Sequence, residues 1–195
     1  MNPYTTDKHE QFRQRVRTFA EKVIKPEAGK LDNEERFSPE LTKKMADEGL
    51  FGLAIPEEYG GQDLDYMALV IAVEEMARID SSQAATVAAI NSLGIGPIYQ
   101  YGTEEQKKRY LPPITREGKT WAFGLTEREA GSDSSSTKTR AELNDGYWHI
   151  NGSKMFISNS ASESSMGITV QAVTGKVGDR NEYSTILVEA DREGY

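Results

Sequence analysis

The stretch GLTEREAGSD, residues 124–133, places hydroxyl groups and flexible backbone directly after the apolar run WAFGL. Thr126 and Ser132 supply hydroxyls, and Gly131 lets backbone N–H groups approach a ligand. Such groups at the end of a strand suit contacts with an anion or a polar heteroaromatic ring. An ordinary loop between two strands accounts for the same residues, and the chemistry of this stretch alone favours that simpler interpretation.

Other catalytic chemistries find little support in the sequence. The chain has no cysteine and two histidines, His9 and His149, which excludes disulfides, thiolate nucleophiles and His-rich metal sites. It contains no GxGxxG or GxxxxGK[ST] phosphate loop and no GxSxG serine motif. Adjacent glutamates occur at 57–58, 74–75 and 104–105, but neighbours on a helix point apart. We therefore interpret these glutamates as solvated faces or helix caps.

The composition is that of a globular protein without a nucleic-acid partner. The 195 residues are 37% hydrophobic and 28% charged, with a net charge of −8, and their number fits one domain or two small ones. No basic patch is visible, and no apolar run approaches the ~18 residues of a membrane span. The polar start of the chain predicts no export and a cytoplasmic location, which the lack of cysteine also fits.

Helical patterns fill the first 118 residues. An apolar face predicts the first helix, and Pro26 is expected to end it. Ser38 is the expected N-cap of a second helix, with Gly49 as its end. The apolar face of the first helix comprises Phe12, Val16, Phe19 and Val23.

Two further helices are expected in the middle of this half. Residues 65–79 are apolar nearly all round, which predicts a helix buried in the centre of a bundle. The Ala-rich helix SSQAATVAAINSLG follows, with Ser81 or Ser82 as its cap and with Gly94 and Gly96 at its end.

A fifth helix closes the helical half, and the pattern then changes. Thr103 and Gln106 form a capping box, and Pro112-Pro113 is expected to stop that helix. After Gly118, β-branched and aromatic residues gather in short runs. These runs are WAFGL, TKTRAEL, YWHI, KMFIS, GITVQAV and YSTILVEA. The turn signals between them lie at 144–146, 151–152, 174–175 and 178–179.

These patterns predict an α+β fold, because the helices are segregated from the strands. We expect an all-helical bundle over residues 1–118, followed by an antiparallel β-barrel-like domain over residues 119–195. The second domain is expected to be incomplete at its C-terminus, because a sheet of this size needs more strands to cover its edge.

Four stretches together resemble the signatures of the acyl-CoA dehydrogenase family of flavoenzymes. GLTEREAGSD is similar to the flavin-contacting signature usually written with TEP and AGSD, and NGSKMFISNS to the second signature, NGxKxWITN. IPEEYGG and PIYQYGTEEQKKRYLP also match, and the four follow in the right order across essentially the whole chain. The chain departs from the pattern at Arg128-Glu129, where Pro-Gly is common, and at Phe156, where Trp is usual.

The resemblance implies FAD as the cofactor and assigns residues to it. Thr126 is expected to hydrogen-bond the polar edge of the flavin, and Ser132 to touch both the pyrophosphate side of FAD and the thioester arm of CoA. Phe156 is expected near the dimethylbenzene edge, with plain β-core packing as its alternative. The full set of expected cofactor contacts is Phe123, Leu125, Thr126, Ser132, Phe156 and Ser158.

The resemblance also places the Ala-rich helix at the wall of the acyl pocket. Besides Ser132, the expected substrate contacts are Ala85, Thr86, Ala89 and Leu93. A tightly packed Ala helix within a bundle explains these residues equally well. Family members that act on dicarboxylic acyl groups carry an Arg early in this helix. No basic residue lies between Arg78 and Lys107 here, so we expect a monocarboxylic acyl-CoA.

The implied activity is α,β-dehydrogenation of an acyl-CoA thioester in fatty acid or amino acid catabolism. Electrons would pass to an electron-transfer flavoprotein, and the complete enzyme would be a homo-oligomer, either a dimer or a tetramer. The family's catalytic Glu belongs to a C-terminal helical domain that these residues do not match. We therefore name no catalytic residue and no metal site, and we expect the 195 residues alone to be inactive. A non-catalytic flavin or acyl-CoA-binding module and an acyl-CoA oxidase of the same fold remain as alternatives.

Overall fold

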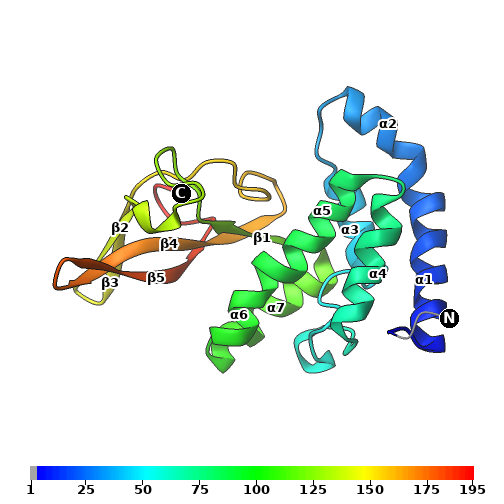
Figure 1. The fold of residues 1–195 in the computed structure, drawn as a ribbon, viewed down its shortest axis with the longest axis horizontal. Coiled ribbons are helices and arrows are strands. Elements are labelled where there is room, and N and C mark those ends of the chain that lie inside the picture. The colour runs from blue at the N-terminus through cyan, green and yellow to red at the C-terminus, as the bar shows by residue number, and fades with distance from the viewer. Residues whose placement is uncertain (1–3) are drawn as a thin grey trace. The chain divides into compact units, whose positions relative to one another are not determined.

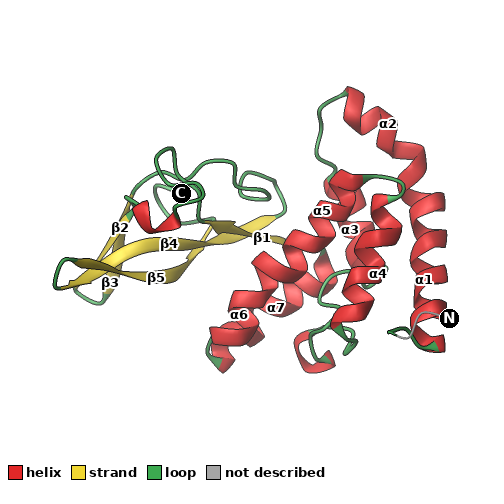
Figure 2. Cartoon of the chain, viewed as in Figure 1, coloured by secondary structure: helices red, strands yellow, loops and turns green. Residues whose placement is uncertain are grey.

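The computed structural model describes residues 4–195 as two compact units (Figure 1). One unit contains the residues up to Thr120 together with Ser162–Ser164, and the other contains Trp121–Ala161 and Ser165–Tyr195. In the described chain the α-helices belong to the first unit, and the strands, from the second residue of β1 onward, to the second (Figure 2). The predicted α+β class is confirmed.

The described part of the helical unit forms seven α-helices, with π-helical turns at two places. The α-helices are α1 (Asp7–Phe19), α2 (Lys25–Asn33), α3 (Pro39–Asp47), α4 (Tyr66–Ala77), α5 (Ser81–Ala89), α6 (Ile95–Tyr101) and α7 (Glu104–Glu117). The π-helical turns are η1 (Ala20–Ile24) and η3 (Ile90–Gly94), and η2 (Glu57–Tyr59) is a short 3₁₀ helix. Their apolar faces meet in a core whose fully buried members include Ile24, Met45, Phe51, Ile71, Met76 and Ile90.

The predicted caps of α3 and α7 are confirmed. The Ser38 hydroxyl accepts a hydrogen bond from the backbone N–H of Leu41 at 3.2 Å. Thr103 and Gln106 form the reciprocal capping box at 2.8 and 3.2 Å. Gly49 follows α3 with a φ of +78°, a conformation that glycine adopts without steric strain. Each cap satisfies backbone groups that have no partner within the helix.

The predicted helix end at Pro26 is wrong. The π-helical turn η1 carries α1 into α2, and the backbone N–H of Lys25 donates to the carbonyl of Ala20. Pro26 thereby lies in the first turn of α2, where its fixed φ suits the helix. The proline marks a change of helix type within a continuous helical segment.

Two other predicted helix ends are also wrong. Gly94 and Gly96 do not end the Ala-rich helix, because the π-helical turn η3 connects α5 directly to α6. The pair Pro112-Pro113 lies inside α7, which continues to a left-handed cap at Gly118. Buried side chains on the last two turns of α7 pack into the core, and such packing outweighs local helix propensity.

Helices α4 and α5 differ from prediction in detail. The carboxylate of Asp80 caps α5 by accepting from the backbone N–H groups of Ser82 at 2.8 Å and Gln83 at 3.1 Å, so neither serine is the cap. Helix α4 is not buried all round, because Tyr66 and Val70 are 68% and 59% exposed. One face of α4 therefore points away from the core of its unit.

The second unit is a single sheet with the strand order β1-β4-β2-β3 and with β5 paired to β4. The strands are β1 (Thr120–Gly124), β2 (Arg140–Asn144), β3 (Tyr147–Asn151), β4 (Ser165–Val177) and β5 (Arg180–Glu189). The pairs β2–β3 and β4–β5 are antiparallel, whereas β2 and β4 are parallel at Arg140 and Val173. The predicted hairpin turns at 144–146 and 178–179 are confirmed. The described strands form no closed barrel.

Three predicted β features are wrong. Residues 154–158 form no strand, because Lys154 and Met155 bond to the loop after β1. The pair Asn151-Gly152 ends β3 without turning into a further strand. The pair Thr174-Gly175 lies inside β4, where the pairing with β5 shifts register at a bulge.

The sheet core fixes the start of β1. Trp121 is 1% exposed, and its indole N–H donates to the Thr169 hydroxyl at 2.9 Å. Ala122, Ile168 and Val170 form the buried cluster beside it.

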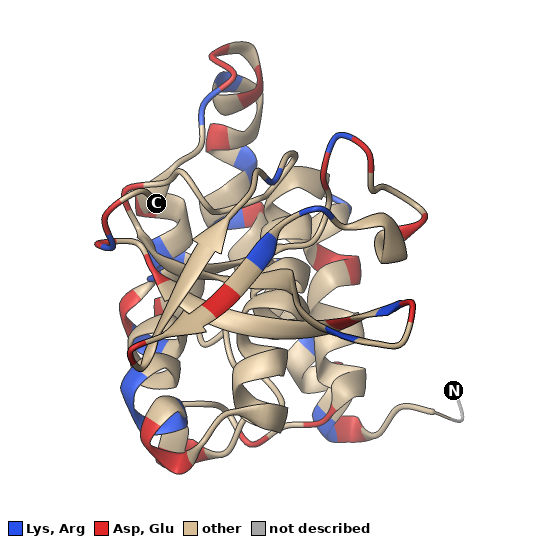
Figure 3. Cartoon of the chain, turned by 90° about the vertical axis from the view of Figure 1, so that its left-hand side faces the viewer, with Lys and Arg blue, Asp and Glu red and all other residues tan. Residues whose placement is uncertain are grey.

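Acidic and basic residues are interspersed over the chain in Figure 3. None of the helices in residues 4–195 has the length and apolarity to cross a bilayer, and no cluster there suits a metal ion.

Candidate functional site

Two segments that are distant in the sequence run side by side in the sheet unit. The backbone N–H of Met155 donates to the carbonyl of Thr126 at 3.0 Å. The ammonium of Lys154 donates to the carbonyl of Leu125 at 2.9 Å. The structure thus brings two of the predicted site residues, Leu125 and Thr126, beside the residues that immediately precede Phe156.

The loop after β1 closes on itself directly after Thr126. Glu127 and Ala130 form an antiparallel bridge, with backbone N···O distances of 3.0 and 3.3 Å. Arg128 and Glu129 are the exposed residues of the turn. The residues that replace the usual Pro-Gly are therefore compatible with a tight turn at this position.

Asp133 ends this loop and starts the 3₁₀ helix η4 (Ser134–Ser136). Its carboxylate accepts from the backbone N–H of Ser135 at 3.1 Å and from the hydroxyls of Ser135 and Ser136. These hydroxyl groups lower the pKa of Asp133. The AGSD part of the stretch is thus an ordered cap.

A buried carboxylate joins the two segments. Glu127 accepts from the Lys154 ammonium at 2.8 Å, from the backbone N–H of Thr139 at 3.0 Å and from that of Lys138 at 2.6 Å. The Thr139 hydroxyl donates to it as well. The side chains of Glu127 and Lys154 are only 4% and 9% exposed. Burial alone would raise the pKa of Glu127, but Lys154 and the other donors lower it to about 2.

Phe156 projects from the second segment into solvent. Its φ of +58° is unusual for an aromatic residue, and the residue as a whole is 86% exposed. A pocket of about 540 Å³ lies beside it, lined by Lys154, Ile157, Ile168 and Tyr195 among others. The alternative that Phe156 packs in a β core is therefore wrong. Strained residues with exposed aromatic rings often mark binding sites.

The remaining predicted cofactor residues belong to the same unit. Phe123 lies on β1 and, like Thr126, is half-buried. Ser132 and Ser158 are exposed, so their hydroxyls are accessible to a ligand. The structure brings Leu125, Thr126 and Phe156 to one place in the sheet unit.

Four of the five predicted substrate residues lie in the helical unit, on the outer face of α5 and η3, whereas Ser132 lies in the sheet unit. Ala85 is exposed, Thr86 and Ala89 are half-buried, and Leu93 is 51% exposed. The opposite face carries the buried residues Gln83, Ala84, Val87 and Ile90. The Ala-rich helix therefore packs into the core through one face, and the predicted substrate contacts lie on the other face.

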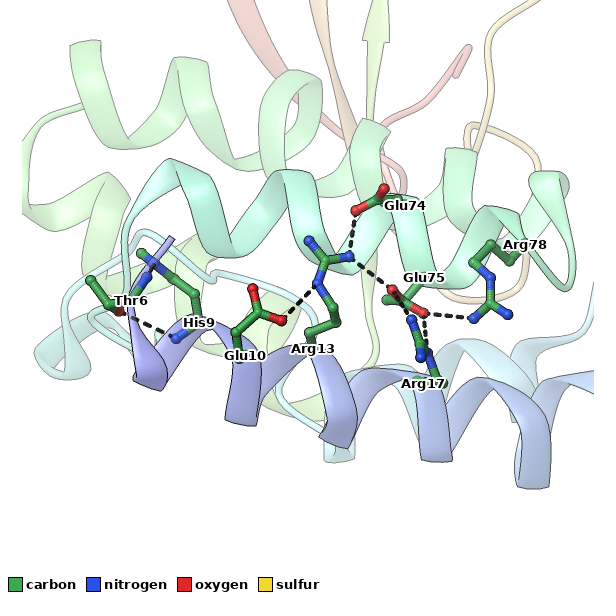
Figure 4. Close-up of polar contacts among 8 residues, drawn as sticks. All are labelled: Thr6, His9, Glu10, Arg13, Arg17, Glu74, Glu75 and Arg78. Carbon is green, nitrogen blue, oxygen red and sulfur yellow. Dashed lines mark hydrogen bonds and ion pairs between the residues drawn. The ribbon is translucent and has the colours of Figure 1, made fainter. Parts of the chain in front are cut away.

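One of the paired glutamates differs from prediction. Glu75 is 1% exposed and bonds to Arg17 at 2.8 and 2.9 Å, to Arg13 at 2.8 Å and to Arg78 at 2.9 Å (Figure 4). Arg17 and the other two guanidinium groups lower the pKa of Glu75 to about 2 against the effect of burial. Arg13 and Arg17 come from α1, so Glu75 joins α1 to α4 and is not solvated.

Sequence reasoning missed Glu127, Lys154 and Thr139 as parts of the site. A usable signal was present, because Glu127 belongs to the first signature and Lys154 to the second, with opposite charges. Thr139 gave no comparable signal, since one threonine in a predicted strand is unremarkable.

Comparison with known proteins agrees with this arrangement. The family models of the acyl-CoA dehydrogenase N-terminal domain and middle domain match residues 6–118 and 122–195. The two matched ranges correspond to the helical unit and to the sheet unit. The chain therefore belongs to the acyl-CoA dehydrogenase family.

Individual relatives support the same assignment. The probable acyl-CoA dehydrogenase FadE25 of Mycobacterium tuberculosis is 40% identical over 189 residues, which cover 97% of this chain and 48% of that protein. The chain spans about half the length of the curated relatives that it matches.

Solved structures support the same assignment. Each of the following three matches covers 100% of this chain. A structure described as the electron-transferring flavoprotein of Acidaminococcus fermentans has a TM-score of 0.92 at 35% identity, over 50% of its chain. Butyryl-CoA dehydrogenase from Megasphaera elsdenii has a TM-score of 0.90 at 33% identity, and the match covers 51% of its chain. An acyl-CoA dehydrogenase complexed with FAD from Bacillus anthracis has a TM-score of 0.89 at 33% identity, and the match covers 33% of its chain.

Proposed function

We propose that residues 1–118 are the N-terminal domain, and residues 119–195 the flavin-contacting part of the middle domain, of an FAD-dependent acyl-CoA dehydrogenase. The observation that carries the proposal is the pairing of the loop 124–133 with the segment 152–158, beside an exposed Phe156 and an apolar pocket. Family membership and the FAD-bound relative from Bacillus anthracis support the cofactor.

The residues present fit a flavin chemically. The exposed ring of Phe156 offers a π face to the apolar end of an isoalloxazine, although it lacks the indole N–H of the usual Trp. The hydroxyls of Thr126 and Ser158 offer hydrogen bonds to its polar atoms. Ser132, exposed after Gly131, suits a pyrophosphate or the arm of CoA. Phe123 and Leu125 complete the apolar contacts.

A bound FAD would supply the redox chemistry, as acceptor of the β hydride of an acyl thioester and donor of electrons to an electron-transfer flavoprotein. The part of this chain is to bind and orient the cofactor and to wall the acyl group. No residue of the chain is assigned to removal of the α proton, which we attribute to a Glu of a C-terminal helical domain. The half-length coverage of the relatives supports such a division. Homo-oligomer formation and a cytoplasmic location stay predictions.

We also propose a monocarboxylic acyl-CoA as the substrate. The outer face of α5 and η3 offers Ala85, Thr86, Ala89 and Leu93, and none of these residues carries a charge that would recognise a second carboxylate. The identity to butyryl-CoA dehydrogenase from Megasphaera elsdenii, 33%, is higher than the 28% identity to glutaryl-CoA dehydrogenase from Mycobacterium smegmatis, and this difference supports the proposal.

The test compares turnover of butyryl-CoA and glutaryl-CoA by the complete protein with an electron-transfer flavoprotein as acceptor. We expect butyryl-CoA to be the better substrate, and a clear preference for glutaryl-CoA would contradict the substrate proposal. Rapid turnover with oxygen as acceptor would favour the oxidase alternative. FAD retention without turnover would favour the binding-module alternative.

A matched pair of variants tests the flavin site itself. Phe156→Ala removes the exposed ring of the site, and we expect it to weaken FAD retention. Leu143→Ala removes a 58% exposed side chain elsewhere in the same unit and should leave retention unchanged. Equal retention in the two variants would remove Phe156 from the site.

A further inference from the structure

The buried ion pair between Glu127 and Lys154 has no part in the contacts assigned to the flavin. It differs from surface ion pairs because both side chains are almost completely buried. Burying two charges carries a desolvation penalty that an apolar pair of similar size avoids, so a buried pair is weak evidence for a role in stability alone. The contacts of the pair are therefore the better guide to its role.

The pair lies at the crossing of the two flavin-contacting segments. Lys154 donates both to Glu127 and to the carbonyl of Leu125, at 2.8 and 2.9 Å. The next residue, Met155, donates its backbone N–H to the carbonyl of Thr126. Both carbonyls therefore belong to predicted flavin contacts, and both donors directly precede Phe156.

No continuous ladder of backbone hydrogen bonds holds these segments in the described chain. Residues 125–126 and 152–155 have no regular secondary structure. The Met155–Thr126 bond joins their backbones, and the remaining bonds that join them come from Lys154. Ile157 packs the second segment against the sheet core, but the hydrogen bonds that set its position along the first segment come mainly from the Lys154 side chain, which Glu127 in turn holds.

Two glycines show how closely the elements approach at this point. A Cβ added at Gly124 would come within 2.8 Å of Ile168 Cδ1 and 3.3 Å of Lys154 Cγ. A Cβ added at Gly152 would come within 2.7 Å of the Cα of Thr139, the residue that bonds Glu127 twice. The absence of these side chains allows the pair and its partners to interlock.

We propose that Glu127 and Lys154 are positioning residues that hold the two flavin-contacting segments in one register and thereby set the affinity for FAD. The proposal rests on the proposed function for its ligand, whereas the coupling of the segments rests on the contacts alone. The charges of the pair cancel, so it acts through the placement of Leu125, Thr126 and Phe156.

The test uses Glu127→Gln, with Glu75→Gln as its matched control. Both substitutions remove a buried carboxylate of lowered pKa, but only the first lies between the two segments. In the complete protein we expect amide hydrogen exchange of residues 124–133 and 152–158 to rise about tenfold in Glu127→Gln and to stay unchanged in Glu75→Gln. We expect the FAD dissociation constant, from quenching of FAD fluorescence, to rise about tenfold in Glu127→Gln alone.

The outcomes separate the inference from the function. Wild-type exchange rates in Glu127→Gln, or an equal loss of FAD affinity in both variants, would overturn the inference. If the wild-type protein binds no FAD, the proposed function fails, and the exchange rates alone decide whether the pair couples the segments. Should Glu127→Gln not fold, Thr139→Val removes one hydroxyl donor and is expected to give a smaller change in the same direction.

Discussion

Each unit of the molecule contains a buried glutamate, and the two are stabilised in different ways. In the helical unit three arginines surround Glu75, and their side chains are 21%, 38% and 48% exposed. In the sheet unit Glu127 has one cationic partner, Lys154, which is itself buried, and its other donors are backbone N–H groups and one hydroxyl. Both carboxylates have a pKa lowered to about 2.

The two glutamates differ in how many partners could compensate for the loss of one. Glu75 joins two helices that also share an extensive apolar core, so the loss of one arginine leaves two others and the packing. Glu127 orders two loops, in which Ala130 is buried and Ile157 packs against the sheet core. In the described residues Lys154 is its one ion-pair partner, so no second cation replaces it. The two glutamates thus have similar pKa values, but Glu75 has several cationic partners, whereas Glu127 has one.

The largest effect is expected for Lys154→Met. It leaves the charge of Glu127 buried without a counter-ion, which typically lowers the free energy of unfolding by ~3–5 kcal/mol. Both tryptophans, Trp121 and Trp148, belong to the sheet unit, so the loss should be seen in urea unfolding followed by tryptophan fluorescence. Lys138→Met is the control, because exposed Lys138 bonds Glu127 only through its backbone N–H. Equal losses in the two variants would contradict the importance of the ion pair.

A second effect concerns pH. The pKa of Glu75 and of Glu127 is lowered from 4.5 to about 2 in the folded protein. The stability that each contributes is fully present above pH ~4.5 and is lost as the pH falls towards 2, by an amount on the order of 3 kcal/mol each. Circular dichroism at 222 nm follows the helical unit, and tryptophan fluorescence follows the sheet unit.

The two glutamine variants assign this acid sensitivity. Glu75→Gln should flatten the pH dependence of the helical signal alone, and Glu127→Gln that of the fluorescence signal alone. If either variant flattened both signals equally, the two units would not unfold as separate parts, and the comparison between them would fail.

A smaller effect is expected for Gly152→Ala. The added methyl group would press on the backbone of Thr139, and overpacking of this kind lowers the free energy of unfolding by about 1–3 kcal/mol. Gly131→Ala in the first segment is the control, since nothing lies within 4 Å of its new Cβ. Unfolding followed by tryptophan fluorescence should show a lower free energy of unfolding for Gly152→Ala only. If both variants were as stable as the wild type, Gly152 and Thr139 would not approach as closely as the structure shows.

The smallest effect is expected for Arg78→Met in the helical unit. Arg78 is about half exposed, and Glu75 keeps two other guanidinium partners. The change in the free energy of unfolding, followed at 222 nm, should stay below ~1 kcal/mol. A loss as large as that of Lys154→Met would show that the arginines do not substitute for one another.

Local signals predicted the parts of the fold that depend on neighbouring residues. The caps at Ser38 and Thr103 and the turn at Asp145-Gly146 follow from side chains and φ preferences within four residues. Pro26 misled because a π-helical turn, which no local pattern announced, placed it in the first turn of a new helix.

The candidate site was predictable only in part for a related reason. The resemblance identified both segments, whereas their junction depends on residues that meet through the fold. The burial of Glu75 depends on α1, and the exposure of Phe156 on a positive φ that its sequence neighbours do not predict. Side-chain partners from distant elements were thus the information that the sequence lacked.

The most direct test of the central claim is amide hydrogen exchange of the complete protein with and without FAD. The claim is that the loop 124–133 and the segment 152–158 together contact the flavin. We predict slower exchange in both segments when FAD is present, with α1 and α4 unchanged. Protection of only one segment, or unchanged exchange in both while FAD is bound, would contradict the claim.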